Sequence, residues 1–281
     1  MSQSSALKKA PQGADRAALK QQLRDSARAM LPGLRARADE GSKLHQLPQQ
    51  NVQEMIDAGF FKILQPARWG GLELDPMDFF DVQMTVAEGC MSTAWVLGVV
   101  ACHNWQLALF DDRAQKDVWG EDDNTLISSS YMPVGKVTHV DGGYRLSGRW
   151  NFSSGSKHCK WVMLGGVVPP KAAGDAPDYR TFLVPISDYT IVDNWEVSGL
   201  EGTGSHDIVV EDVFVPEYRT HRSIDGFLCD SPGNKVNTSP LYRLPFGQIF
   251  VRAVCSSSIG ALQAALDSFI KINRDRVGLN D

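Results

Sequence analysis

The spacing of the apolar residues changes twice along the chain, and this change constrains the fold more than any other feature. From Arg16 to Asp123 apolar residues recur at steps of three and four, which predicts amphipathic helices. From Leu126 to about Pro216 they alternate with a period of two, in short runs separated by glycine, proline and aspartate, which predicts β-strands. Helical spacing returns at Phe246–Asn273. This order predicts an α+β fold with a β domain between two helical regions.

These changes predict five segments. They are a disordered N-terminus (1–15), an N-terminal helical domain (16–123), a middle antiparallel β barrel or sandwich (124–222), a connecting loop (223–245) and the first helix of a C-terminal helical bundle (246–281). A single final helix has few partners to pack on. We therefore expect the chain to be a truncated form of a longer protein.

Local signals predict where individual elements begin. Asp75-Pro76 is typical of a helix start with proline in the first turn, while Ser92 and Asp112 suit N-caps of the next two helices. Lys136–His139 and Tyr144–Phe152 flank Asp141-Gly142-Gly143, which is the pattern of a β-hairpin with a glycine turn.

Composition excludes several classes of function. A net charge of -5 without a basic block argues against nucleic-acid binding. The polar first residues lack the apolar core of a secretion signal, and the run Ala94–Cys102 is about half of the ~20 residues that a membrane span needs. The five cysteines form no CxxC pair, which indicates reduced thiols and no zinc site. We expect a cytoplasmic protein that binds neither membrane nor metal.

The motifs that could carry chemistry are individually weak. No GxGxxG follows a strand, so we expect electrons to arrive on a carrier other than a bound NAD(P)H. The glycine-rich string from Gly199 to Ser205 suits either a tight turn or contact with a flavin or phosphate. Ser128-Ser129-Ser130 and Ser153-Ser154 are hydroxyl clusters at predicted strand ends, where they could bind a ring cofactor or only form turns. His103, beside an apolar helix face, suits either a phenol pocket or an ordinary structural role.

Together these strings resemble a known family. The segments 103–110, 119–122, 127–133, 150–155 and 199–205 are similar to the oxygenase subunits of two-component, reduced-flavin aromatic hydroxylases, which have an acyl-CoA-dehydrogenase-like fold. The similarity is greatest to the HsaA type, which 4-hydroxylates a phenolic secosteroid in steroid breakdown, and lower to the p-hydroxyphenylacetate 3-hydroxylases. It covers nearly the whole chain after residue 17.

The resemblance implies roles for particular residues. Ser154 corresponds to the serine that faces flavin N5, and His103 to the histidine that contacts the phenolic hydroxyl; these two are the predicted catalytic residues. Ser129 corresponds to a residue near both flavin and substrate, and Arg243 to a basic residue on the substrate or flavin side. The remaining predicted cofactor-binding residues are Trp95, Gly202, Thr203 and Ser205.

The resemblance also implies the reaction. A separate NADH-dependent reductase would supply FMNH2 or FADH2, and oxygen would add to the flavin to give a C4a-hydroperoxide. The hydroperoxide would then hydroxylate a phenol ortho to its first hydroxyl, in a protein that assembles as a homotetramer. The C-terminal bundle of the family carries a second active-site histidine, so the early end of this chain puts its activity in doubt.

Two rival functions stay open. An acyl-CoA dehydrogenase shares the scaffold but needs tightly bound FAD and a carboxylate base, and this chain reads Ser130-Tyr131-Met132-Pro133 where those enzymes have an acidic string. A truncated, non-catalytic paralogue that only binds flavin is the second rival.

Overall fold

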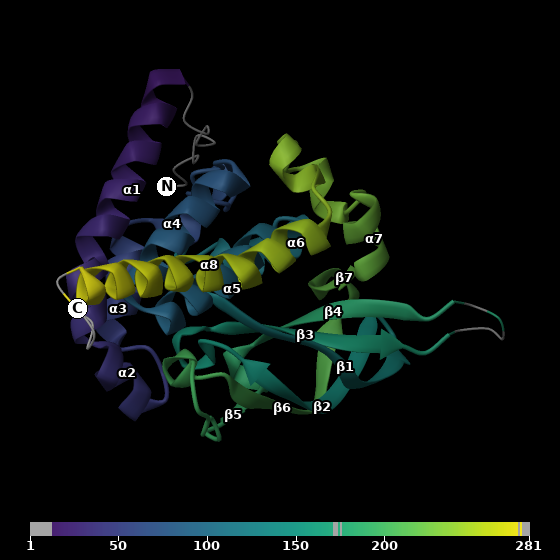
Figure 1. The fold of residues 1–281 in the computed structure, drawn as a ribbon. Coiled ribbons are helices and arrows are strands. Elements are labelled where there is room, and N and C mark those ends of the chain that lie inside the picture. The colour runs from purple at the N-terminus through teal and green to yellow at the C-terminus, as the bar shows by residue number, and fades with distance from the viewer. Residues whose placement is uncertain (1–12, 171–173, 175, 275, 277–281) are drawn as a thin grey trace.

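The computed structural model describes residues 13–170, 174, 176–274 and 276, and it consists of a group of helices beside a curved β-sheet (Figure 1). The helices are α1 (Gly13–Ala36), α2 (Ala38–Leu44), α3 (Gln49–Asp57), α4 (Pro76–Gly89), α5 (Met91–Leu107), α6 (Asp112–Trp119), α7 (Ser223–Leu228) and α8 (Phe246–Asn273). The strands are β1 (Ile127–Val140), β2 (Gly143–Ser153), β3 (Trp161–Val168), β4 (Asp178–Pro185), β5 (Thr190–Val192), β6 (His206–Pro216) and β7 (Thr220–Arg222). The predicted α+β class is confirmed. The predicted disorder of 1–15 falls on residues 1–12, which lie outside the described residues, and on residues 13–15, where it is wrong because α1 begins at Gly13.

The helix starts agree with prediction at α4 and differ at α5 and α6. Pro76 is the first residue of α4, after Asp75, as predicted. The N-cap of α5 is Cys90 and not Ser92, because this one extended residue, at φ -158°, both ends α4 and begins α5. The N-cap of α6 is Asp111 and not Asp112, since the Asp111 side chain accepts the backbone N–H of Arg113.

The centre of the helical part is α5. From Thr93 to Leu107 nearly every residue of this helix is buried, including the polar His103, Asn104 and Gln106. Buried polar side chains need hydrogen-bond partners, so each of them must be matched by a neighbouring element. Asn104, for example, donates to the Phe61 carbonyl oxygen at 2.9 Å.

The sheet has seven strands in the order β5-β6-β2-β1-β3-β4-β7. The predicted hairpin is confirmed: β1 and β2 are antiparallel, with Val140 opposite Gly143. One pairing differs from the predicted antiparallel arrangement, because β1 and β3 are parallel. The chain reaches β3 after β2 already occupies one edge of β1, so it crosses to the other edge and arrives in the direction of β1. The start of β1, with Ser129 opposite Met163, therefore lies against β3.

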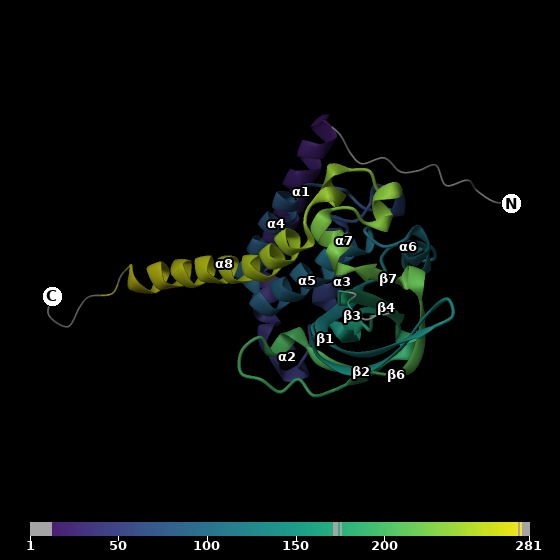
Figure 2. The same ribbon diagram turned by 90° about the vertical axis from the view of Figure 1, so that its right-hand side faces the viewer.

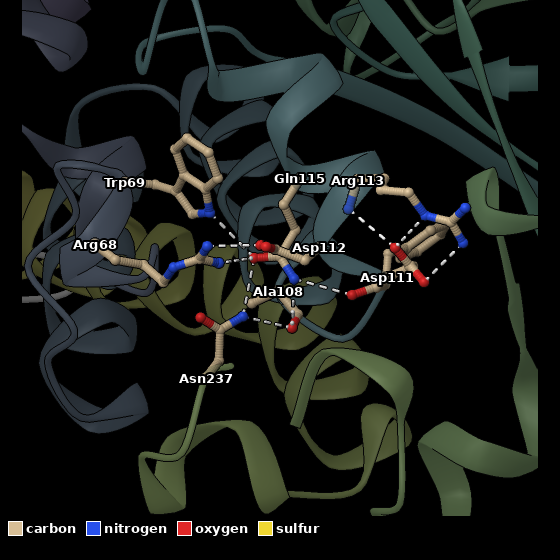
Figure 3. Close-up of polar contacts among 9 residues, drawn as sticks. Arg68, Trp69, Ala108, Asp111, Asp112, Arg113, Gln115 and Asn237 are labelled. Carbon is tan, nitrogen blue, oxygen red and sulfur yellow. Dashed lines mark hydrogen bonds and ion pairs between the residues drawn. The ribbon is translucent and has the colours of Figure 1, made fainter. Parts of the chain in front are cut away.

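The connecting segment before α8 is fixed to the helical part by Gln115 of α6 (Figure 3). The buried Gln115 Oε1 accepts from Arg68 Nη1 (3.2 Å), Trp69 Nε1 (3.2 Å) and Asn237 Nδ2 (3.0 Å). Its Nε2 donates to the carbonyl of Phe110 at 2.9 Å. One side chain thus joins the loop after α3, the segment after α5 and the connecting segment.

The first half of α8 packs across α4 and α5, and its second half extends beyond the rest of the molecule (Figure 2). Gln83 of α4 is buried and donates to the Ala94 carbonyl of α5 at 3.1 Å and to the Ala253 carbonyl of α8 at 2.6 Å. By length and composition alone α8 could also cross a membrane, with 28% of its most apolar stretch buried. A core helix passes the same test, so this is weak support for a membrane span.

Candidate active site

A mostly apolar cavity of about 240 Å³ lies between α5, the start of β1, the end of β2 and the start of α8. It is lined by Trp95, Val99, Ser129, Ser130, Tyr131, Met132, Asn151, Phe152, Ser154, Phe250 and Val254. None of these described lining residues is charged. An apolar cavity with a few fixed polar groups is the usual form of a small-molecule site. The structure therefore brings together the two predicted serine clusters and Trp95, from separate parts of the sequence.

His103 lies directly behind this cavity and holds Ser129 in place. Its Nδ1 is 2.7 Å from the carbonyl oxygen of Ile127, and its Nε2 is 2.8 Å from Ser129 Oγ. A carbonyl oxygen only accepts, so Nδ1 carries the proton and Nε2 accepts the hydroxyl proton of Ser129. Ser129 therefore lines the cavity, whereas His103 is not among the lining residues and contacts Ser129 from behind. The predicted contact of His103 with the phenolic hydroxyl stays a prediction.

His103 is fully buried, and this burial lowers its pKa to about 4. Desolvation penalises the charged imidazolium, while the hydrogen bond to Ile127 opposes this effect. The ring is therefore neutral at physiological pH, in the single tautomer that its two contacts require.

A second group of hydroxyls lies behind Ser154. Ser154 Oγ accepts from Trp95 Nε1 at 3.1 Å and is 2.7 Å from Ser205 Oγ. Ser205 Oγ is in turn 2.7 Å from Thr203 Oγ1, which donates to the Leu200 carbonyl at 2.9 Å. Ser205 and Thr203 are buried and do not line the cavity, so they reach it only through Ser154.

The two remaining predicted site residues lie away from the cavity. Gly202 packs between the helices, where an added Cβ would meet Ser92 Cβ at 3.3 Å and the Gly41 carbonyl carbon at 3.5 Å. Arg243 is an exposed residue at the end of a short helical turn and is not among the lining residues. Their roles in binding flavin or substrate stay predictions.

Sequence reasoning missed an aromatic wall made by Tyr131 and the start of α8. The Tyr131 ring meets Phe250 edge-on at 5.1 Å and Phe246 at 5.5 Å, and the two phenylalanine rings stack at 5.4 Å. Burial raises the pKa of the Tyr131 hydroxyl well above its usual value, so it stays protonated and donates to Gln106 Oε1. The signal was available as Phe246 and Phe250 one helical turn apart, but no rule of periodicity indicates which helix face meets a distant strand.

Phe152 was also missed, although it lines the cavity. The residue is 63% exposed, and its backbone has φ 66°, which is unfavourable for a residue with a Cβ. The register between β2 and β6 shifts between Trp150 and Ser153, and this irregularity turns the Phe152 ring toward Trp195, which it meets edge-on at 6.0 Å. Strained residues of this kind are concentrated at functional sites.

All three serines that line the cavity use their hydroxyl protons within the protein. Ser129 donates to His103 Nε2, Ser130 donates to the Asn151 carbonyl at 2.7 Å, and Ser154 is hydrogen-bonded to Ser205. A hydroxyl whose proton is engaged presents only lone pairs on its other side. Ser129 and Ser130 therefore offer acceptors to the cavity, which suits a ligand with O–H or N–H groups.

Comparison with known proteins gives a consistent result. Residues 14–122 match the model of the acyl-CoA dehydrogenase N-terminal domain. The chain is 42% identical over 249 residues to the flavin-dependent monooxygenase oxygenase subunit HsaA of Rhodococcus jostii, covering 89% of this chain and 65% of that protein. It thus spans less than two thirds of that relative's length.

Solved structures agree with this relationship. The crystal structure of 3-HSA hydroxylase from Rhodococcus sp. RHA1 superposes with a TM-score of 0.88 at 40% identity, covering 92% of this chain and 68% of that one. XiaF from Streptomyces sp., solved in complex with FADH2 and glycerol, superposes with a TM-score of 0.84 at 25% identity, covering 95% of this chain and 67% of that one. The chain belongs to the family of flavin-dependent monooxygenase oxygenase subunits, on the acyl-CoA-dehydrogenase-like fold.

Proposed function

We propose that this chain is the oxygenase component of a two-component monooxygenase that hydroxylates a phenol ortho to its hydroxyl group, using reduced flavin and O2. The observation that carries the proposal is that Ser129, backed by His103, and Ser154, backed by Trp95, line one apolar cavity. The family relationship supports the same reading. The cavity lining supports a neutral substrate such as a phenolic secosteroid, because no lining residue among those described would pair with a substrate carboxylate.

Reduced flavin fits the residues present. Trp95 and Phe152 provide aromatic surface for a planar ring, and Ser154 provides a hydroxyl oxygen beside them. When bound, the flavin would supply the electrons that activate O2 for transfer of one oxygen atom to the ring. We propose that FMNH2 or FADH2 is delivered by a separate NADH-dependent reductase.

Ser129 would receive the phenol. Its proton is engaged by His103, so its free lone pair accepts the phenolic O–H and orients the ring. His103, with a pKa of about 4, is a weak base and acts by fixing the direction of the Ser129 hydroxyl. The hydrogen bond to Ser129 raises the electron density at the phenol oxygen. This favours reaction of the ring carbon ortho to the hydroxyl group with the activated oxygen.

The apolar lining would keep water from the reacting groups. Val99, Phe250 and Val254 close the helix side of the cavity, and Met132 lies at the strand side. Exclusion of water strengthens the hydrogen bonds at the serines and suppresses wasteful release of hydrogen peroxide.

We also propose that the protein assembles as a homotetramer in the cytoplasm.

The acyl-CoA dehydrogenase alternative lacks support at the site. That chemistry needs a carboxylate to remove a proton next to a carbonyl, and no Asp or Glu is among the described lining residues. Bleaching of bound FAD by an acyl-CoA in the absence of a reductase would favour this alternative and contradict the proposal.

The test is a single-turnover hydroxylation. The protein is mixed with photoreduced FMN or FAD, O2 and a phenolic secosteroid, and the products are separated by mass spectrometry. The proposal expects the substrate plus one oxygen atom in an ortho-diol, labelled when 18O2 is used. Flavin binding with hydrogen peroxide as the sole product would instead support the non-catalytic paralogue.

A further inference from the structure

Ser154 is the end of a row of hydroxyls that continues away from the cavity. The row runs from Ser154 through Ser205 and Thr203 to the backbone carbonyl of Leu200, with successive distances of 2.7, 2.7 and 2.9 Å. Thr203 is fully buried and Ser205 nearly so. Neither hydroxyl reaches water or the cavity, so their hydrogen bonds are confined to this row.

The number of protons fixes the direction of the row. Three hydroxyl groups supply three protons to three contacts, and Leu200 at the far end can only accept. Thr203 therefore donates to Leu200, Ser205 donates to Thr203, and Ser154 donates to Ser205. The Ser154 oxygen also accepts the Trp95 indole N–H, which leaves it one lone pair and no proton for the cavity.

The Leu200 carbonyl is held firmly in this role. It accepts from the backbone N–H of Thr203 at 3.0 Å and from Trp195 Nε1 at 3.2 Å in addition to the Thr203 hydroxyl. Leu200 has φ 55°, in the left-handed region, after Gly199 at φ 83°. A residue with a side chain rarely adopts this backbone conformation without compensation. Here the compensation is the set of hydrogen bonds that the Leu200 carbonyl accepts from Thr203 and Trp195.

We propose that Thr203 and Ser205 are positioning residues that make Ser154 a hydrogen-bond acceptor toward the cavity, and that this polarity selects reduced over oxidised flavin. The inference rests on the proposed function and on the expectation, from the family resemblance, that Ser154 faces flavin N5. Reduced flavin carries a hydrogen on N5 that a serine lone pair accepts. Oxidised flavin has a lone pair at N5, which would face the lone pair of Ser154 without a proton between them.

The consequence is a specific effect on binding selectivity. Removal of the hydroxyl at either position frees the Ser154 proton, since Ser154 can then rotate and donate to oxidised N5. The ratio of the dissociation constants of oxidised and reduced flavin should fall by about tenfold, the equivalent of one hydrogen bond. A merely structural role for Thr203 or Ser205 would weaken the binding of both forms together.

The test compares Thr203→Val and Ser205→Ala with Thr203→Ser, which keeps the hydroxyl and serves as the matched control. Dissociation constants are measured anaerobically for photoreduced FMN and FAD, and aerobically for the oxidised forms, in each folded variant. Thr203→Val keeps nearly the same side-chain shape while it removes the hydroxyl, so it changes the buried packing at this position less than a larger change would. The chemical shift of 15N-labelled N5 in reduced flavin gives a second readout of its hydrogen bond.

The expected result is a strong preference of the wild type for reduced flavin, a lower preference in Thr203→Val and Ser205→Ala, and a wild-type preference in Thr203→Ser. An unchanged ratio in both hydroxyl-deleted variants, with flavin still bound, overturns the positioning role and leaves the proposed function intact. A wild type that binds neither form overturns both. Preferential binding without hydroxylation contradicts only the proposed oxygenase activity.

Discussion

Acidification should destabilise this protein through its buried histidines. Burial lowers the pKa of both His103 and His221 to about 4, from 6.5. Between these values the unfolded chain binds protons that the folded chain does not, so stability is fully present above the unfolded pKa and is lost as the pH falls from 6.5 toward 4.

The size of the effect follows from the shift. Between about pH 7 and about pH 4.5, each of the two lowered pKa values reduces the free energy of unfolding by about 2 kcal/mol. The two histidines together reduce it by about 4 kcal/mol. Total stabilities of domains are about 5–15 kcal/mol, so the loss should be large. Carboxylates such as Asp111 and Asp207, whose pKa values lie below the ordinary 3.8 in the folded protein, lose their contribution only at lower pH.

The assay is urea unfolding followed by tryptophan fluorescence at about pH 7 and about pH 4.5. His221→Gln keeps an amide that can hydrogen-bond to Ser231, and His103→Asn keeps a donor for the Ile127 carbonyl; neither variant titrates. Each variant should lose about 2 kcal/mol less on acidification than the wild type. If both variants lose as much stability as the wild type, the assignment of the effect to these buried rings is wrong.

Two further predictions concern packing. Gly98→Ala should destabilise the fold by about 2 kcal/mol or more in thermal melting, because the new methyl would lie 2.0 Å from Gln83 Nε2; Gly247→Ala, which meets nothing within 4 Å, should not. Gln115→Ala should cost about 2–4 kcal/mol in urea unfolding, since it removes the hydrogen-bond partner of Trp69 Nε1 and of the Phe110 carbonyl, whereas the exposed Gln53→Ala should stay within about 0.5 kcal/mol. A melting temperature equal to wild type in Gly98→Ala, or equal losses in the two glutamine variants, would contradict these accounts.

Periodicity and turn chemistry identified most of the secondary structure from the sequence. The bounds of α8 and the hairpin of β1 and β2 agree with prediction, because helical spacing and a glycine turn are local signals. The parallel pairing of β1 with β3 was not predicted, since it depends on which strand edge is free when the chain returns. Local patterns do not carry that information.

The sequence likewise predicted only part of the candidate site. Ser129, Ser154 and Trp95 were predicted from the family resemblance, and they line one cavity. The arrangement of His103 behind Ser129 could not be read from the sequence, because it depends on where the Ile127 carbonyl lies in three dimensions. The row formed by Thr203 and Ser205 was likewise visible only as a glycine-rich turn, since hydroxyl direction is set by distant acceptors.

The role of Ser129 as the acceptor for the phenolic hydroxyl is the central claim, and phenol affinity tests it most directly. The dissociation constant of a neutral phenol is measured in the presence of bound flavin for wild type, Ser129→Ala and the surface control Ser187→Ala. The account predicts affinity about tenfold weaker in Ser129→Ala alone, with the yield of ortho-diol per reduced flavin falling in parallel. Equal affinity and yield in all three proteins would contradict it.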